Sequence, residues 1–232
     1  MSLALTRLLQ LASPALPVGA YTYSQGLEWA VEAGTVQGEA TALTWIGDQL
    51  EWNLGRFEAP LLANMLAAWQ IGAHETAREL DAQYLASRES AELRAETLQM
   101  GYSLRRLLDE LRDLPDEFLA QIAVPATGHF IPPAPTFAWV WSGVAACWNI
   151  APADALTAWL WSWAENQTMA ALKSVPLGQA AGQRILLEIG RRIPAVVARA
   201  LTLGADEYSN FAPGFAIACC RHETQYTRLF RS

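Results

Sequence analysis

The sequence predicts an all-α fold, a single-domain bundle of about ten helices that spans residues 1–232. Apolar residues recur at spacings of three and four along most of the chain, as in helices that bury one face. No segment alternates apolar and polar residues between hairpin turns, and no repeat has a solenoid period. At 52% hydrophobic residues, the chain can fill one substantial core.

Prolines and glycines divide the first part of the chain into helices. A helix over residues 3–12 should stop before Pro14, because a proline disfavours the α conformation of the residue that precedes it. Thr22 followed by Gln25 fits a capping box, which predicts that the next helix begins there. Gly34 stands where a left-handed residue would end that helix.

The next helices are expected over residues 41–54 and 59–71, separated at Gly55. The clearest helix of the chain covers residues 90–114, where leucines and a methionine repeat on one face. Gly101 weakens the interior of this helix by about 1 kcal/mol relative to alanine, and indicates a close helix crossing.

The second half of the chain begins with a proline-rich segment, residues 124–135, which predicts a loop. The two segments that follow are apolar on most faces, as buried helices are. Pro194 is expected to interrupt a helix and start another. Helices are therefore predicted over residues 137–148, 152–173, 179–193, 195–203 and 213–226.

Composition argues against several classes of protein. The net charge of −7 disfavours nucleic-acid binding, which needs clustered lysine and arginine. The apolar runs fall short of the roughly 20 residues of a membrane-spanning helix, and the N-terminus lacks the features of a secretory signal. Three cysteines are too few for a disulfide framework. We therefore expect a cytoplasmic protein.

Motifs of catalysis are absent or incomplete. His222 begins a stretch that resembles a zinc-protease helix, but Tyr226 stands where the second histidine is needed. Cys219 and Cys220 could join His222 at a soft metal, yet adjacent cysteines point in different directions on a helix. No phosphate-binding loop, nucleophile elbow or aspartate-rich run occurs. We expect no catalytic residue, metal or cofactor, and an interaction protein rather than an enzyme.

The segment LLQLASPALPVGAYTYSQGLEWAVEAG, residues 8–34, resembles the N-terminal signature of UreF, a family of urease accessory proteins. Residues 93–108, 172–186 and 221–232 resemble the same family in the same order. The resemblance implies an all-helical homodimer that binds UreD, called UreH in some systems. This complex would recruit the GTPase UreG and assist nickel insertion into apo-urease, with the present chain as scaffold and regulator rather than metal carrier.

The resemblance and the residue types together suggest where partners bind. The tail, residues 227–232, is expected to be mobile when free and to fold on a partner, inserting an aromatic ring and pairing its arginines with carboxylates. The expected partner-binding residues are Tyr21, Tyr23, Glu28, Lys173, Arg221, His222, Tyr226, Arg228 and Phe230. Several of them have simpler interpretations, because the tyrosines could be half-buried core residues and the charged residues could stabilise a helix end.

Two alternatives remain at this point. An all-α small-molecule enzyme could wall its site with tryptophans, although in strongly apolar helices packing is the commoner role of this residue. A purely structural homodimer is the other alternative. The tryptophans in question are Trp139, Trp141, Trp159, Trp161 and Trp163.

Overall fold

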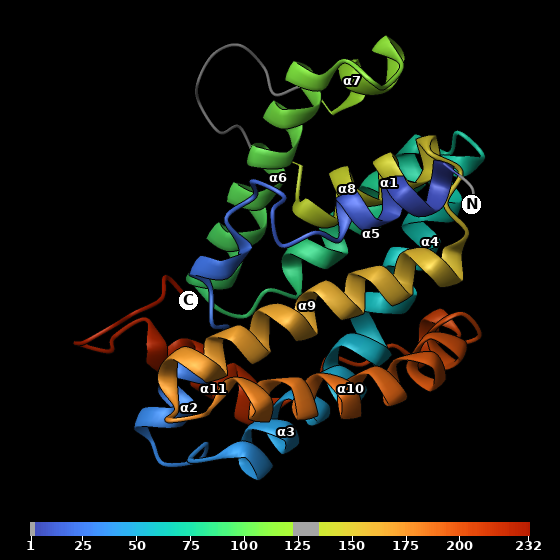
Figure 1. Ribbon diagram of the computed structural model, residues 1–232. Helices are drawn as coiled ribbons and strands as arrows, with labels where there is room; N and C mark the ends of the chain where they lie inside the picture. The colour runs from blue at the N-terminus through green and yellow to red at the C-terminus, as the bar shows by residue number, and fades with distance from the viewer. Residues whose placement is uncertain (1–2, 123–134) are drawn as a thin grey trace.

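The computed structural model describes residues 3–122 and 135–232, in which helices and turns occur without a strand (Figure 1). These helices form a single compact domain, which confirms the predicted all-α fold. Three helical segments of other types, η1 to η3, lie among the α-helices. The elements are α1 (Leu3–Leu11), η1 (Ala20–Thr22), α2 (Leu27–Glu32), α3 (Glu39–Asp48), η2 (Gln49–Glu58), α4 (Ala59–Gln70), α5 (His74–Ala86), α6 (Ala91–Leu111), α7 (Asp116–Gln121), α8 (Phe137–Cys147), α9 (Pro152–Ser174), α10 (Gln179–Ala200), η3 (Ala205–Glu207) and α11 (Pro213–His222).

Helix α9 organises the bundle, because it contacts α1, α2, α3, α4 and α10 (Figure 1). Its buried residues lie on several faces, which agrees with the apolar sequence of this segment. Trp159 stacks on Phe137 with ring centroids 5.3 Å apart, and Trp141 meets the same indole edge to face at 5.3 Å. Phe137 and Trp141 of α8 therefore pack against Trp159 of α9.

Helix α10 continues through Pro194, so the predicted interruption at this residue is wrong. Pro194 lies on the exposed face, where a carbonyl that loses its helical partner can reach water. Ile189, Ile193 and Val197 are buried before and after the proline. Their burial offsets the roughly 3 kcal/mol that an interior proline costs a helix.

The expected break at Gly55 is also wrong, since α3, η2 and α4 follow one another without a gap. Segment η2 is π-helical, a wider winding than the α-helix. A Cβ atom on Gly55 would lie 2.7 Å from Cγ1 of Val196 on α10. The glycine therefore permits close helix packing at a position where the sequence suggested a turn.

Helix α2 begins differently from the prediction. Its N-cap is Gly26, with φ 76° and no side-chain hydrogen bond, so the capping box of Thr22 and Gln25 is not formed. Thr22 instead donates to the carbonyl of Gly19 at 2.8 Å. Gly34 has φ 75° just beyond the end of α2, which confirms its predicted role.

Gly101 marks the close crossing that the sequence indicated. A Cβ atom there would lie 2.5 Å from the carbonyl oxygen of Pro135 and 2.7 Å from the carbonyl carbon of Thr136, just before α8. The α6 backbone thus packs directly on the chain that enters α8. The predicted loop at 124–135 lies outside the described residues apart from its last position.

Gly101→Ala should destabilise the protein by about 1–3 kcal/mol, because the added methyl group meets rigid backbone. An exposed helical glycine would instead gain about 1 kcal/mol from the same change, so the sign is diagnostic. Urea unfolding measures the effect. Gly214→Ala is the matched control, since Gly214 is an exposed residue of α11 and nothing lies within 4 Å of its Cβ position. A stabilised Gly101→Ala variant would contradict the crossing.

Asp81 on α5 accepts a hydrogen bond from the hydroxyl of Thr136, the N-cap of α8. Burial raises the pKa of Asp81 from 3.8 to about 6, although the hydrogen bonds from Thr136 lower it. At pH values between 3.8 and about 6, Asp81 is protonated in the folded protein but ionised in the unfolded chain. Stability contributed by this site therefore falls as the pH rises through that window.

Asp81→Asn should be more stable than the wild type at pH 8 by about 1–3 kcal/mol, because the amide accepts from Thr136 without becoming charged. At pH 4 this advantage should vanish. Urea unfolding at both pH values tests the prediction, with Glu79→Gln on the exposed face of α5 as control. Equal stability of Asp81→Asn and wild type at pH 8 would contradict it.

Candidate partner-binding site

The C-terminal segment, residues 223–232, packs against the folded chain in the structure, whereas the sequence analysis expected a mobile tail. Helix α11 ends at His222, four residues earlier than predicted, and the segment then turns back toward α6 and the loop before α2 (Figure 1). Phe230 is only 7% exposed and belongs to the main hydrophobic core. An aromatic anchor therefore holds the end of the chain inside its own domain.

Glu28 binds the backbone of the C-terminal segment. Its Oε1 accepts from the backbone N–H of Leu229 at 2.6 Å, and its Oε2 accepts from that of Phe230 at 3.1 Å. The N–H of Arg231 donates to the carbonyl of Thr22 at 2.7 Å. Glu28 lies in the first turn of α2, is itself buried, and so makes internal contacts in place of the expected partner contact.

His222 connects two carboxylates beneath the segment. Its Nε2 lies 3.1 Å from Oε2 of Glu28, and its Nδ1 lies 2.7 Å from Oε2 of Glu92. Both ring nitrogens can donate to these oxygens only in the imidazolium form. Arg228 meets the other oxygen of Glu92 at 2.6 Å. His222 is fully buried, so it positions Arg228 through Glu92 and does not itself face a partner.

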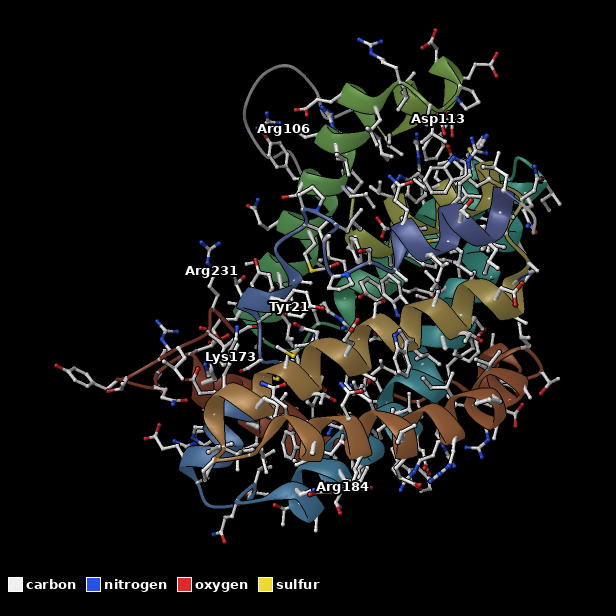
Figure 2. The ribbon with its side chains drawn as sticks, in the orientation of Figure 1. Tyr21, Arg106, Asp113, Lys173, Arg184 and Arg231 are labelled. Carbon is white, nitrogen blue, oxygen red and sulfur yellow. The ribbon has the colours of Figure 1, made fainter. Side chains whose placement is uncertain are left out.

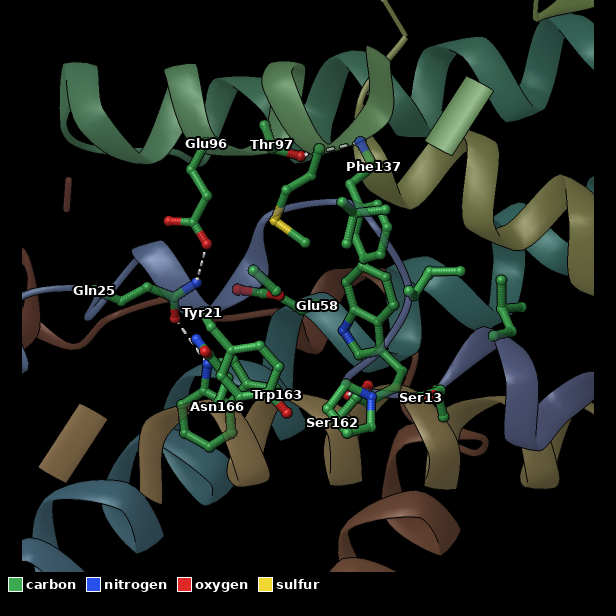
Figure 3. A pocket seen from close by; sticks show the side chains of 18 of the residues that line it. Ser13, Tyr21, Gln25, Glu58, Glu96, Thr97, Phe137, Ser162, Trp163 and Asn166 are labelled. Atoms are coloured by element: carbon green, nitrogen blue, oxygen red, sulfur yellow. Dashed lines mark hydrogen bonds between the residues drawn. The ribbon is translucent and has the colours of Figure 1, made fainter. Parts of the chain in front are cut away.

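Glu96 connects the C-terminal segment to the signature loop, which we define as residues 13–26. Its Oε1 accepts from Nε2 of Gln25 at 2.7 Å, and its Oε2 accepts from the hydroxyl of Ser232 at 3.0 Å. Gln25 in turn accepts from the indole N–H of Trp163 at 2.7 Å (Figure 3). Burial raises the pKa of Glu96 to about 7, although the hydrogen bonds from Gln25 and Ser232 lower it.

The two signature tyrosines occupy different environments. Tyr23 is a buried core residue, and its carbonyl accepts from the side-chain amide of Asn166 at 3.0 Å. Tyr21 is half-buried at the wall of a cavity (Figure 3), and burial, assisted by the charge of Glu165, raises its pKa to about 12. Tyr21 therefore keeps its hydroxyl proton at neutral pH and can donate a hydrogen bond.

The cavity has a volume of about 90 Å³ and lies between the signature loop, α6, α8 and α9. Trp159 and Trp163 are part of its wall, whereas Trp139 and Trp141 belong to the packed core. The tryptophans therefore do not form the common wall that the enzyme alternative required.

The exposed part of the site is basic and apolar. Tyr226 is fully exposed and Leu229 is 70% exposed, and Arg221 and Arg228 are exposed on the same part of the chain. Nζ of Lys173, at the end of α9, lies 5.5 Å from the centre of the Phe230 ring. Figure 2 shows Lys173 and Arg231 on the same side of the molecule as Tyr21. We define the exposed face as the set of five residues Lys173, Arg221, Tyr226, Arg228 and Leu229.

Metal and membrane sites find no support in the described part of the chain. No group of three or more histidine, cysteine, aspartate or glutamate side chains there could hold a metal ion. Cys219 is buried and Cys220 exposed, and burial raises the pKa of the Cys219 thiol. None of the helices described is long and apolar enough to cross a membrane.

The sequence analysis missed the carboxylates of α6. Glu92 and Glu96 hold Arg228, His222 and the end of the chain, yet neither was selected as a site residue. A signal was present, because Glu96 follows Leu93 by three residues and so lies on the apolar face of its helix. A charged residue at such a position is rarely buried unless it has a partner.

These observations define an all-helical protein whose C-terminal segment packs on the loop before α2 through the buried carboxylates of Glu28 and Glu96, with an exposed face beside it. The family model for UreF matches residues 36–190. Urease accessory protein UreF of Dechloromonas aromatica (strain RCB) is 60% identical over 230 residues, 99% of this chain and 98% of the relative. That of Azoarcus sp. (strain BH72) is 58% identical over 233 residues, covering 99% and 96%. The chain belongs to the UreF family, which confirms the resemblance seen in its motifs.

Glu28→Ala should release the C-terminal segment, because two backbone N–H groups and the His222 ring lose their acceptor. We expect tryptic cleavage after Arg228 to accelerate at least about tenfold, and the free energy of unfolding to fall by about 2–4 kcal/mol. Mass spectrometry of timed digests measures the cleavage. Glu32→Ala, at an exposed position of the same helix, is the control. Wild-type cleavage of Glu28→Ala would show that Glu28 does not anchor the segment.

Proposed function

We propose that this protein is a non-enzymatic scaffold of urease maturation. It forms a homodimer, binds UreD/UreH, recruits the GTPase UreG and so supports nickel insertion into apo-urease. Membership of a family of urease accessory proteins supports the general role. The observation that carries the binding role is the exposed face, which is held in place by the buried residues Glu28 and Phe230 and by the ion pair of Arg228 with Glu92.

The residues of the exposed face suit protein binding. Tyrosine and arginine are enriched among the residues that contribute most to protein–protein affinity. Tyr226 and Arg228 are both exposed on this segment, and Leu229 adds apolar area beside them. Because the chain already orders this segment, less conformational entropy is lost when a partner binds.

A non-catalytic role also agrees with the use of the buried acids. Glu96 and Asp81 have raised pKa values, a property that active-site acids share. Each of them, however, accepts hydrogen bonds from other segments of the same chain. Burial at structural contacts accounts for both pKa values without a reaction.

Size-exclusion chromatography with light scattering tests the proposal. The chain alone should elute as a dimer, UreD/UreH should add to it in a defined ratio, and UreG with GTP should enlarge the complex further. A chain whose mass is unchanged in every mixture would contradict the scaffold role. The cavity beside Tyr21 should then be screened for ligands.

Tyr226→Ala and Arg228→Ala should each weaken binding of the UreD/UreH or UreG partner at least about tenfold, about 1.4 kcal/mol. Titration calorimetry with each purified partner measures the change. Phe211→Ala is the control, since Phe211 is 81% exposed and lies before the other end of α11. Full affinity of both variants for both partners would exclude this face as the binding surface.

A further inference from the structure

The cavity between the signature loop, α6, α8 and α9 has walls of two kinds (Figure 3). Two of its lining residues are buried glutamates, Glu58 and Glu96, each 6% exposed. No lysine, arginine or histidine occurs among the lining residues that the structure describes. The remaining walls are largely apolar, and the aromatic lining residues are Tyr21, Tyr84, Phe137, Trp159 and Trp163. The cavity is therefore both acidic and aromatic.

The two carboxyl groups of the cavity share a single basic partner. Oε1 of Glu58 forms an ion pair with the guanidinium of Arg88 at 2.8 Å. Glu96 accepts hydrogen bonds from the side-chain amide of Gln25 at 2.7 Å and from the hydroxyl of Ser232 at 3.0 Å, and both of these donors are neutral. A positive charge placed in the cavity would attract the Glu96 carboxylate strongly, because little water screens the interaction there.

The aromatic walls suit an organic cation. The face of an aromatic ring carries partial negative charge and attracts ammonium and guanidinium groups, most strongly where water is excluded. Tyr84 already makes such a contact outside the cavity wall, since Cζ of Arg88 lies 4.4 Å from the centre of its ring. A cation that enters the cavity therefore meets both a carboxylate and ring faces.

The acidic and apolar groups lie on different sides of the cavity. Figure 3 shows Gln25 and Glu96 on one side and Phe137 on the other. Phe137 and Trp159 stack with ring centroids 5.3 Å apart and so give this second side an extended apolar surface. A ligand with a cationic group at one end and a short apolar part at the other matches this division.

A metal ion fits the cavity less well. Beyond its two glutamates, the described lining contains no aspartate, histidine or cysteine. Metal ions in proteins usually take four or more such ligands or backbone oxygens, whereas an organic cation can use ring faces in their place. The volume of about 90 Å³ has room for several water molecules or for one small organic molecule.

We propose that this cavity is a binding site for a small organic cation, an alkylammonium or guanidinium compound. The charged group of the ligand lies beside Glu96, and its apolar part lies against Phe137 and Trp159. The bound ligand connects the signature loop to α6 and α9. This site belongs to the chain alone and does not rest on the proposed function.

Three probes of similar shape and different charge test the site, namely butylammonium, butan-1-ol and butyrate. Each is titrated into the protein at pH 8, above the pKa of about 7 of Glu96, and the indole N–H resonance of Trp163 is followed by NMR. Butylammonium should shift it saturably, with a dissociation constant at least about tenfold below that of butan-1-ol. Butyrate should cause no saturable shift. The exposed indole of Trp52, outside the cavity, is the internal control.

Matched variants locate the binding. Ser162→Leu fills the cavity from α9 and should abolish binding, whereas Thr157→Leu, at an exposed position of the same helix, should retain it. Glu96→Gln should weaken butylammonium binding to about the level of butan-1-ol. Circular dichroism verifies the fold of each variant. If Glu96→Gln does not fold, the three probes on the wild type and on Ser162→Leu decide the result.

Equal affinity for butylammonium and butan-1-ol would show a cavity without charge preference and would overturn the proposal. The absence of a saturable shift would also overturn it, as would binding that survives in Ser162→Leu. These titrations use the chain without partners. A failure of UreD/UreH binding would therefore refute the proposed function and leave the cation site standing.

Discussion

The hydrogen bonds from the C-terminal segment to the Glu28 carboxylate are the interaction on which the site depends. A carboxylate buried as deeply as that of Glu28 is unstable unless donors surround it. The backbone of Leu229 and Phe230 supplies two of these donors, and Nε2 of His222 lies 3.1 Å from Oε2 of the acid. The segment supplies donors that the buried acid needs, and the acid in turn fixes the backbone of the segment. The C-terminal segment and the start of α2 therefore stabilise each other.

The need to bring donors close to the buried Glu28 carboxylate also explains the unusual backbone before α2. Gln25 has φ 51°, which few residues other than glycine adopt, and Gly26 follows with φ 76°. A Cβ atom on Gly26 would lie 2.9 Å from the backbone nitrogen of Cys219. Helix α11 thus crosses directly over the signature loop, and this close approach brings His222 beside Glu28. The left-handed conformation also directs Gln25 between Glu96 and Trp163.

The sequence predicted the fold well because helical periodicity reflects burial, which dominates folding. The wrong predictions concern residue types that can play two different structural roles. Pro194 and Gly55 were interpreted as helix breaks, yet one lies on a solvent-facing side and the other permits contact with Val196. Tertiary packing determines which use applies, and a single sequence does not contain that packing.

The site was predicted in part for a related reason. A short tail with arginines and an aromatic residue suggests a mobile segment, because its own apolar area is small. The stabilising groups are Glu28 and Glu92, which are far away in the sequence and are visible as acceptors only once the fold brings them close. Glu28 was selected as a site residue, but as a partner contact. Its actual contacts are internal.

The structure divides the predicted binding residues into two sets with different physical roles. Glu28, His222 and Phe230 are buried and fix the segment, whereas Tyr226 and Arg228 remain accessible on its outer side. A partner that binds only the outer set meets a segment that is already ordered, and so loses little entropy. A partner that needs Phe230 must first break the contacts of Glu28. The strength of those internal contacts therefore sets which kind of partner this surface can accept.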